Sequence, residues 1–456
     1  LEDPYGPEQH GFGKGHSTVS LLHIFAAVIH TSTLSNKEVA IVQIDVAKAF
    51  DKVHRAALTS FAKNIIRGVA PEAATFIESM YDGDEVNISF GKATKTINMK
   101  SGIRQGDPLS PALFSALVGH VLRPLIIQWR SRGWRAEIDP SQPGERITLL
   151  AYADDMTVFA SSRDQASLMI NEMTAALEGI NLRLLPERCS ALWSEAPAGT
   201  ETAKINLGTE NIPILGALVV MGQEIVFKKD SMHSFQHRLR QAWKTAHANA
   251  ILLRSTTMSH GARIRLLQAL VKPSLLYGAE TWKLTPALLA KIIGAERAFS
   301  RWCMRLTNRS GTTGEEERDI AAWVQWQAES ARKIAKTTHK QHIERWHVTA
   351  LRLHWKWAGK AARNKGSLNH IAATTHIKPI GRGRPQAHWA QLLRQFSTRE
   401  LMGNASSWEQ LAESKVQWLS FCDLFVEFVE TQVLRADTRA TLARDAVAIR
   451  QENIEQ

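Results

Sequence analysis

The chain has 456 residues, of which 44% are hydrophobic and 22% charged; this ordinary globular composition excludes a collagenous or low-complexity protein. At roughly 150 residues per domain, this length predicts about three domains. The net charge of +12 is uneven, because residues 1–230 carry 22 basic and 26 acidic side chains whereas residues 231–456 carry 34 and 18.

The predicted elements change character near the middle of the chain. In chain order, the first half predicts a strand at 39–45, a helix at 52–66 capped by Asp51, and a helix that begins at Pro71. A hairpin of 86–90 and 95–99 around Gly91 follows. The last two elements are a helix at 110–130 begun by Ser110-Pro111 and a hairpin of 147–151 and 156–160. Beyond about residue 229 the pattern predicts amphipathic helices at 233–254, 259–277 and 285–306, with loops at 311–314 and 381–385.

Cysteine and apolar patterns add further exclusions. Three widely spaced cysteines cannot form a disulfide framework or a CxxC metal knuckle, which favours a reducing compartment: Cys189, Cys303 and Cys422. Apolar stretches such as Ile212–Met221 are shorter than the ~18 residues that span a bilayer, so we predict no membrane segment. Because the chain starts Leu1-Glu2-Asp3-Pro4, we expect it to begin inside a longer reading frame.

Tryptophan is concentrated in the basic half. Eleven of the 14 tryptophans lie there, interleaved with basic residues as in His354-Trp355-Lys356-Trp357. One interpretation is a surface for a phosphate backbone with exposed bases. The other is a helical domain with Trp in its core and Arg on its solvated face.

Three carboxylates stand at predicted strand ends. Asp154 and Asp155 lie at the tip of the 147–160 hairpin, and Asp45 ends the 39–45 strand. An isolated Asp-Asp pair is ordinarily a solvated turn. Three carboxylates at neighbouring strand ends instead suit Mg²⁺, which prefers oxygen ligands. Asp51 is a weaker candidate, because its position favours helix capping.

Ordered sequence blocks around these carboxylates resemble the reverse transcriptases of LINE-type (non-LTR) retrotransposons. The three main blocks are Gln43–Asp51, Ser101–Pro111 and Tyr152–Asp155. Residues 9–18 look like the fingers block, Ile214-Leu215-Gly216 like the primer-grip hairpin, and residues 272–282 like the thumb block. The resemblance covers residues 9 to about 305 well and the tail loosely.

This resemblance implies a fold and an activity. The fold would be α+β, a right-hand polymerase whose palm is an antiparallel sheet with packed helices. Its parts would be truncated fingers (1–36), palm (37–229), helical thumb (230–310) and a basic helical nucleic-acid-binding region (311–456). The activity would be RNA-directed DNA polymerase, a nucleotidyltransferase that uses two Mg²⁺ ions, with Mn²⁺ possible. Its partners would be an RNA template, a DNA primer or target and deoxynucleoside triphosphates (dNTPs), without a membrane, in a nuclear or cytoplasmic ribonucleoprotein inside the cell.

Site residues follow from the matching blocks. The resemblance implies that Asp45, Asp154 and Asp155 are the catalytic metal carboxylates, with Asp155 the least direct ligand. It assigns the nucleotide and template contacts to the Val46 carbonyl, Phe50, Gln105, Gly106, Lys14 and Arg188, and the primer contacts to Tyr152, Leu215 and Gly216. Phe50 would exclude a ribose 2′-hydroxyl; the alternative is a core aromatic residue.

The chain departs from the family pattern in places. Gly13 and His16 stand where the family has arginines, and Arg188 replaces a lysine that could donate a proton. With a shortened fingers region as well, we expect catalysis by this chain alone to be weak or absent. Residues 382–385 resemble an AT-hook core, although a basic loop is the simpler interpretation.

Two other functions stay open. One is a degenerate element that only binds RNA or DNA; the other is a group II intron-type reverse transcriptase. The thumb block and the lack of a recognisable His-Asn-His endonuclease tail favour the LINE-type interpretation.

Overall fold

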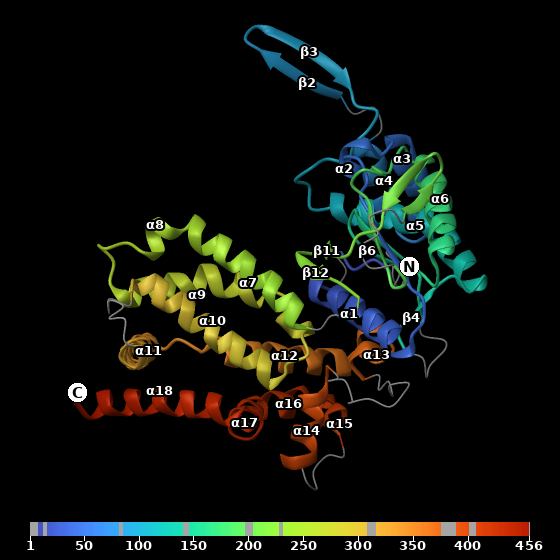
Figure 1. Ribbon diagram of the computed structural model, residues 1–456. Helices are drawn as coiled ribbons and strands as arrows, with labels where there is room; N and C mark the ends of the chain where they lie inside the picture. Colours follow the sequence, from blue (N-terminus) through green and yellow to red (C-terminus); the bar gives the residue numbers. More distant parts are fainter. Residues whose placement is uncertain are drawn as a thin grey trace. The chain divides into compact units, whose positions relative to one another are not determined.

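The computed structural model describes residues 8–11, 16–81, 85–139, 146–196, 204–227, 231–307, 316–374, 389–400 and 407–455. The predicted loops at 311–314 and 381–385, and the family positions Gly13 and Lys14, lie outside these residues. The described residues up to 227 form a sheet unit, and those from 231 onward form a helical unit. Figure 1 shows the elements of each.

A four-stranded antiparallel sheet organises the sheet unit. Its strand order is β6-β7-β1-β8, where β6 is Leu149–Tyr152, β7 is Asp155–Ala160, β1 is Ala40–Ile44 and β8 is Ser190–Trp193. The predicted strand at 39–45 and the predicted hairpin at 147–160 are therefore confirmed. Runs of Val, Ile and Leu favour strands here because their branched side chains pack well on a pleated surface.

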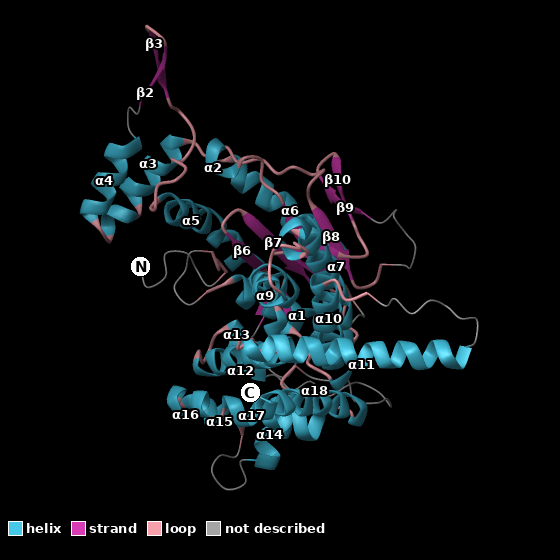
Figure 2. Ribbon diagram, turned by 90° about the vertical axis from the view of Figure 1, so that its left-hand side faces the viewer, coloured by secondary structure: helices cyan, strands magenta, loops and turns pink. Residues whose placement is uncertain are grey.

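Helices cover both faces of this sheet (Figure 2). On one face, Val42, Ile44 and Val158 belong to a core cluster that includes residues of α5 (Ser110–Ser131) and α6 (Arg163–Glu178). The alternate residues face α1 (Thr18–Ser35), where the rings of Phe25 and Phe159 lie 5.0 Å apart. By length and composition alone, α1 and α5 could each cross a membrane, but both contribute buried side chains to this unit.

The remaining elements of the sheet unit are short. They are α2 (Ala49–Lys52), α3 (Arg55–Asn64), α4 (Pro71–Tyr81), the hairpin β2 (Glu85–Phe90) with β3 (Ala93–Asn98), β4 (Ala136–Glu137) with β5 (Arg146–Ile147), β9 (Lys204–Leu207) with β10 (Glu210–Pro213), and β11 (Leu218–Val220) with β12 (Gln223–Ile225). The predicted helix from Pro71 and the predicted hairpin around Gly91 are confirmed. Gly91 has φ +61°, a left-handed conformation that glycine adopts without steric cost.

Two predicted caps are wrong. Asp51 does not cap the 52–66 helix: it lies in the first turn of α2, and α3 begins after His54 without a side-chain cap. The Asp51 carboxylate instead accepts a hydrogen bond from Gln105 Nε2 at 2.8 Å, so a distant partner displaces the local one. Ser110 is not the N-cap of α5, the role that the Ser110-Pro111 pair predicts: Leu109 is the N-cap, and Ser110 is the first helical residue.

The helical unit contains helices only, within the residues described. They are α7 (Ser231–Ala248), α8 (Ala250–Leu253), α9 (His260–Leu276), α10 (Pro286–Met304), α11 (Glu316–Lys340), α12 (Trp346–Arg363), α13 (Leu368–Thr374), α14 (Gln391–Glu400), α15 (Trp408–Glu413), α16 (Lys415–Ser420), α17 (Cys422–Phe428) and α18 (Ala436–Glu455), with a 3₁₀ turn at Ala279–Thr281 and a π turn at Val429–Val433. The predicted helix at 285–306 is α10, whose N-cap is Thr285: its side chain accepts from Leu288 N–H, and Pro286 follows at the start of the helix.

Seven of the 11 tryptophans of this unit are buried in its core, and this decides between the two interpretations of the His354–Trp357 stretch. Trp355 and Trp418 stack with ring centroids 3.7 Å apart, and each indole N–H donates to the other residue's carbonyl, at 2.8 and 2.9 Å. A Cβ on Gly359 would lie 2.3 Å from Trp418 Nε1, so this pair requires glycine there. The surface interpretation of this stretch is wrong, because Trp355, Trp357 and His354 are all buried.

A buried ion network joins early and late helices of the helical unit. Arg345, which precedes α12, contacts Glu296 of α10 and Asp445 of α18, both at 2.9 Å. Arg297 contacts the same Asp445 at 2.7 Å. The predicted thumb segment (230–310) and the predicted tail (311–456) thus lie within one compact unit.

Candidate active site

Antiparallel pairing brings the three predicted carboxylates to one end of the sheet. Ile44 of β1 pairs with Met156 of β7, so the next positions in this register are Asp45 and Asp155. Because side chains alternate along strands, these two positions share a face of the sheet. Asp154 belongs to the two-residue turn between Tyr152 and Asp155, which pair across the hairpin. Asp45 and the Asp154–Asp155 pair, more than 100 residues apart in the sequence, therefore lie at the same end of the sheet.

The electrostatics agree with this proximity. Asp155 is exposed at the end of the hairpin, yet its pKa is raised above the usual carboxylate value, first by desolvation and then by the negative charges of Asp154 and Asp45. A cation would relieve this repulsion. Among the residues that the structure describes, no group of three or more His, Cys, Asp or Glu side chains is already arranged as a metal-ligand set.

The backbone of Asp45 is fixed by the segment before β8. Leu185 N–H donates to the Asp45 carbonyl at 3.0 Å, and Asp45 N–H donates to the Cys189 sulfur at 3.4 Å. Cys189 is buried, and its burial raises the pKa of the thiol. Val46 forms an isolated antiparallel β-bridge with Leu184 of the same segment. The Arg188 side chain, next to Cys189 in the sequence, is exposed.

The loop before α5 carries the predicted template residues. Gln105 is exposed and donates to Asp51, and the two residues help to line a cavity of about 520 Å³. Gly102 and Gly106 have φ +92° and +87°, which few other residues adopt. A Cβ on Gly106 would meet nothing within 4 Å, so the space beside it is open.

Phe50 has both a packed and an accessible part. Its ring stacks on Phe114 of α5 with centroids 4.5 Å apart, and it packs against the core cluster. It is nevertheless only partly buried. The structure therefore gives Phe50 a packing role without removing it from the surface.

The predicted primer residues lie on two segments. Tyr152 ends β6 directly before the turn that carries Asp154. Leu215 and Gly216 are exposed in the link between β10 and β11, where Leu215 N–H donates to the Ala191 carbonyl of β8 at 2.7 Å. Lys14 falls outside the described residues.

Sequence reasoning overlooked Gln9, which contacts the carboxylate hairpin directly. The Ala153 N–H donates to Gln9 Oε1 at 3.0 Å, and Gln9 Nε2 donates to the Ala153 carbonyl at 3.3 Å. Gln9 lies inside the fingers-like block, and that block was the available signal. Its contact with residue 153 could not be seen from spacing.

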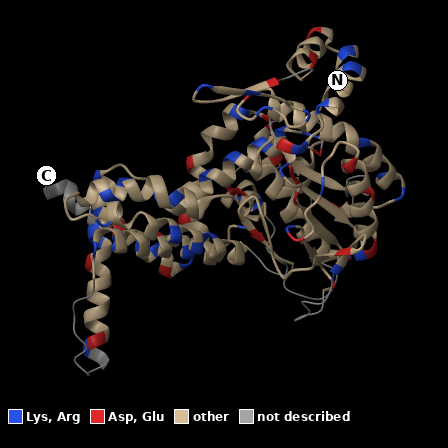
Figure 3. Cartoon of the chain, turned by 90° about the horizontal axis from the view of Figure 1, so that it is seen from above, with Lys and Arg blue, Asp and Glu red and all other residues tan. Residues whose placement is uncertain are grey.

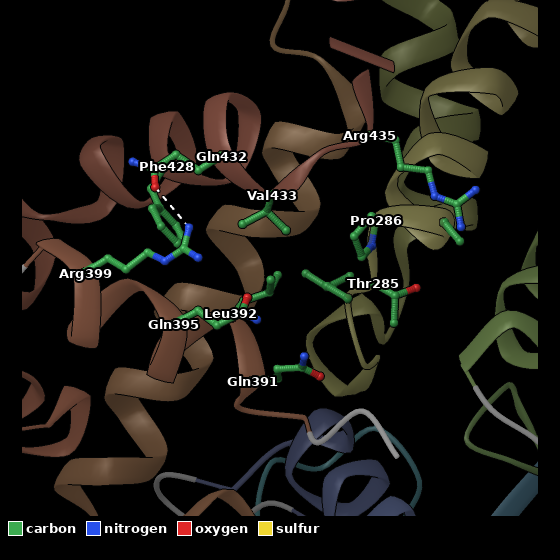
Figure 4. A pocket seen from close by; sticks show the side chains of 12 residues that line it. Thr285, Pro286, Gln391, Leu392, Gln395, Arg399, Phe428, Gln432, Val433 and Arg435 are labelled. Atoms are coloured by element: carbon green, nitrogen blue, oxygen red, sulfur yellow. Dashed lines mark hydrogen bonds between the residues drawn. The ribbon is translucent and has the colours of Figure 1, made fainter. Parts of the chain in front are cut away.

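The helical unit has a polar pocket of its own. This pocket, of about 570 Å³, is lined by the start of α10, one face of α14 and the end of α17 with its π turn (Figure 4). Leu392, Phe428 and Val433 supply apolar surface, and Arg399 donates to Gln432 at 3.3 Å. Among the described residues that line the pocket none is acidic, and the polar ones are Thr285, Gln391, Gln395, Gln432, Arg399 and Arg435.

The first half of the chain is similar to a known protein family. Residues 2–219 match the family model described as reverse transcriptase (RNA-dependent DNA polymerase). The Pol polyprotein of the type-1 retrotransposable element R2 of Nasonia vitripennis is 29% identical over 185 residues, 39% of this chain and 16% of that protein. The chain thus matches about a sixth of that relative's length.

Two further similarities extend beyond the first half. A transposon-derived protein of Caenorhabditis elegans is 23% identical over 287 residues, 61% of this chain and 95% of that protein. The solved structure of apo telomerase from Candida tropicalis is 12% identical, with a TM-score of 0.38, covering 72% of this chain and 58% of that chain.

Proposed function

We propose that this chain copies RNA into DNA, and that the reaction takes place at the strand ends that carry Asp45, Asp154 and Asp155. Residues 2–219 form a reverse transcriptase domain of the type that non-LTR retrotransposons encode. The reaction is attack of a primer 3′-hydroxyl on the α-phosphate of a dNTP. The observation that carries this proposal is the register that brings three carboxylates to one end of the sheet. There desolvation, and then the charges of Asp154 and Asp45, raise the pKa of Asp155.

The oxygen donors at this end of the sheet suit divalent metal ions by their chemistry. The three carboxylates, with the Val46 carbonyl, would hold two Mg²⁺ or Mn²⁺ ions, hard cations that take oxygen ligands. When bound, such ions stabilise the attacking and leaving oxygens of an in-line phosphoryl transfer.

The chain's own residues would position the reactants. Gln105 and the open space beside Gly106 would accommodate template and nucleotide, and Phe50 would face the sugar. Exposed Arg188 would neutralise departing pyrophosphate by charge, because a guanidinium stays protonated. Tyr152, Leu215 and Gly216 would contact the primer, and Lys14 the template or nucleotide.

These assignments extend to architecture and location. We assign the palm to 37–229, a short part of the fingers to 1–36, the thumb to 230–310 and a nucleic-acid-binding region to 311–456. A protein that works on an RNA template would act inside the cell, in a nuclear or cytoplasmic ribonucleoprotein.

Mn²⁺ binding tests the proposed site without requiring turnover. Electron paramagnetic resonance measures free Mn²⁺ as the full chain is titrated. Asp45→Asn and Asp154→Asn should each raise the Kd for Mn²⁺ by roughly tenfold or more, about 1.4 kcal/mol. Asp164→Asn is the matched control, because that carboxylate is 87% exposed on α6. Unchanged Mn²⁺ binding in both Asp45 and Asp154 variants would contradict the proposal.

We further propose that the helical unit binds the nucleic-acid strand through phosphate contacts. Residues 231–456 carry a net charge of +16, and Figure 3 shows Lys and Arg recurring along these helices. The pocket of Figure 4 combines two guanidinium groups and three amides with apolar surface. Guanidinium groups recognise phosphate, whereas amides and apolar surface suit a base.

The salt dependence of RNA binding tests this role. For single strands, each phosphate contact contributes about 0.7 to the slope of log K against log salt. Arg399→Gln with Arg435→Gln should therefore reduce the slope of the full chain by about 1.4, whereas Lys365→Gln should leave it nearly unchanged. Lys365 is the control because it is an exposed cation paired with Glu413 in the same unit. An unchanged slope in the double variant would remove the pocket from the binding surface.

A further inference from the structure

We propose that Gln9 is a positioning residue that holds the Asp154 turn in the geometry that metal binding requires. This inference rests on the proposed function, because it concerns the same carboxylates. Gln9 is 3% exposed and lies 144 residues before Ala153, the residue next to Asp154 in the turn.

One side-chain amide holds both polar groups of the Ala153 residue. Gln9 Oε1 accepts from Ala153 N–H at 3.0 Å, and Gln9 Nε2 donates to the Ala153 carbonyl at 3.3 Å. The same Oε1 accepts from Gly11 N–H at 2.8 Å, which orients the amide. With the amide in this orientation, its oxygen accepts from the Ala153 N–H and its nitrogen donates to the Ala153 carbonyl.

The backbone around Gln9 is fixed to the hairpin as well. Gln9 forms a parallel bridge with Ala151 of β6, where His10 N–H donates to the Ala151 carbonyl at 2.7 Å and Ala151 N–H donates to the Glu8 carbonyl at 2.8 Å. Gly11 approaches so closely that a Cβ there would lie 2.6 Å from Ala153 N. Residues 8–11 therefore form a short extended segment that is hydrogen-bonded along β6 and the turn after it.

The turn needs such support because of its conformation. Ala153 has φ +60°, a left-handed value that is unfavourable for a residue with a Cβ, by roughly 1 kcal/mol. The next two residues carry carboxylates that repel each other. Without the Gln9 amide, the Ala153 N–H and carbonyl lose these two hydrogen bonds, and the turn that carries Asp154 is free to relax.

Metal affinity separates positioning from mere stability. We expect Gln9→Met, which keeps the side-chain length but removes the amide, to raise the Kd for Mn²⁺ at least tenfold in the full chain. Gly11→Ala should have the same effect by steric pressure on Ala153 N and on Gln9 Oε1, while the glutamine itself is kept. If extension is measurable, Gln9→Met should raise the Mg²⁺ concentration that gives half-maximal rate.

Two control variants match these changes. Thr31→Val removes a different buried long-range hydrogen bond of the sheet unit, from Thr31 Oγ1 to the Ile138 carbonyl at 2.6 Å. Gly68→Ala adds a Cβ that meets nothing within 4 Å. Neither control should change the Kd for Mn²⁺, whatever its effect on melting temperature.

The outcomes distinguish the two levels of the proposal. If wild type binds Mn²⁺ through Asp154 and both Gln9→Met and Gly11→Ala bind it equally well, the positioning role is wrong and the site stands. If Thr31→Val weakens Mn²⁺ binding as much as Gln9→Met does, Gln9 contributes stability alone. If Asp154→Asn binds Mn²⁺ as well as wild type does, or if wild type does not bind Mn²⁺, the proposed site itself is wrong.

Discussion

Acid should destabilise the helical unit through His354. This side chain is fully buried in α12, and its ring packs on Trp389 with centroids 4.3 Å apart. Burial lowers the pKa of His354 from 6.5 to about 3, although the Glu280 backbone opposes this shift. The folded protein therefore keeps the imidazole neutral, whereas the unfolded chain protonates it near its ordinary value.

The sign and size of the effect follow from this difference. Stability from the neutral imidazole is complete above pH 6.5 and is lost as the pH falls toward 3, because the unfolded state binds the extra proton. The loss is about 1.4 kcal/mol per pH unit well below 6.5, which integrates to about 2 kcal/mol between pH 7 and pH 5.

His354→Phe removes the titration and keeps an aromatic ring. We would measure urea unfolding at pH 7 and pH 5 by tryptophan fluorescence, because 11 of the 14 tryptophans lie in residues 231–456. The free energy of unfolding of the variant, relative to wild type, should rise by about 2 kcal/mol between pH 7 and pH 5. Other titrating groups, including buried His10, cancel in this comparison. Replacement of the exposed His339 by Gln is the control.

A relative free energy that stays constant to within about 0.5 kcal/mol from pH 7 to pH 5 would refute this reasoning, because it would mean that His354 titrates alike in both states.

Two further predictions concern aromatic side chains. Phe50→Val should raise the ratio of ribonucleotide to deoxyribonucleotide incorporation, because a smaller side chain no longer excludes a 2′-hydroxyl; if both rates fall and the ratio stays constant, Phe50 acts by stacking on Phe114 alone. Trp418→Phe should lower the free energy of unfolding by about 1–3 kcal/mol, since it leaves the buried Trp355 carbonyl without its donor; a thermal melt within about 1 °C of wild type would contradict this.

Much of the fold could be predicted from local sequence. The β-branched run before Asp45 predicts β1, and Pro71 marks the start of α4, because these signals act within a few residues. Helix α10 follows its Thr285-Pro286 start in the same way. The family blocks then identified which strand ends carry carboxylates.

The rest depends on contacts between distant residues. Asp51 is a good local cap by type and position, but it pairs with Gln105, 54 residues away. The basic and aromatic His354–Trp357 stretch is typical of a nucleic-acid surface, yet its rings are buried because α12 lies inside the helical unit. Gln9 meets Ala153 across 144 residues, and no periodicity encodes such a pair.

Primer extension on an RNA template tests the central claim most directly. With the full chain, a DNA primer, dNTPs and Mg²⁺ or Mn²⁺, we expect slow extension that chelation of the metal abolishes. Asp154→Asn should reduce this rate by roughly a thousandfold or more, equivalent to about 4 kcal/mol of transition-state stabilisation, while RNA binding stays unchanged. Measurable extension that is equal in wild type and Asp154→Asn would contradict the assignment of these carboxylates to catalysis.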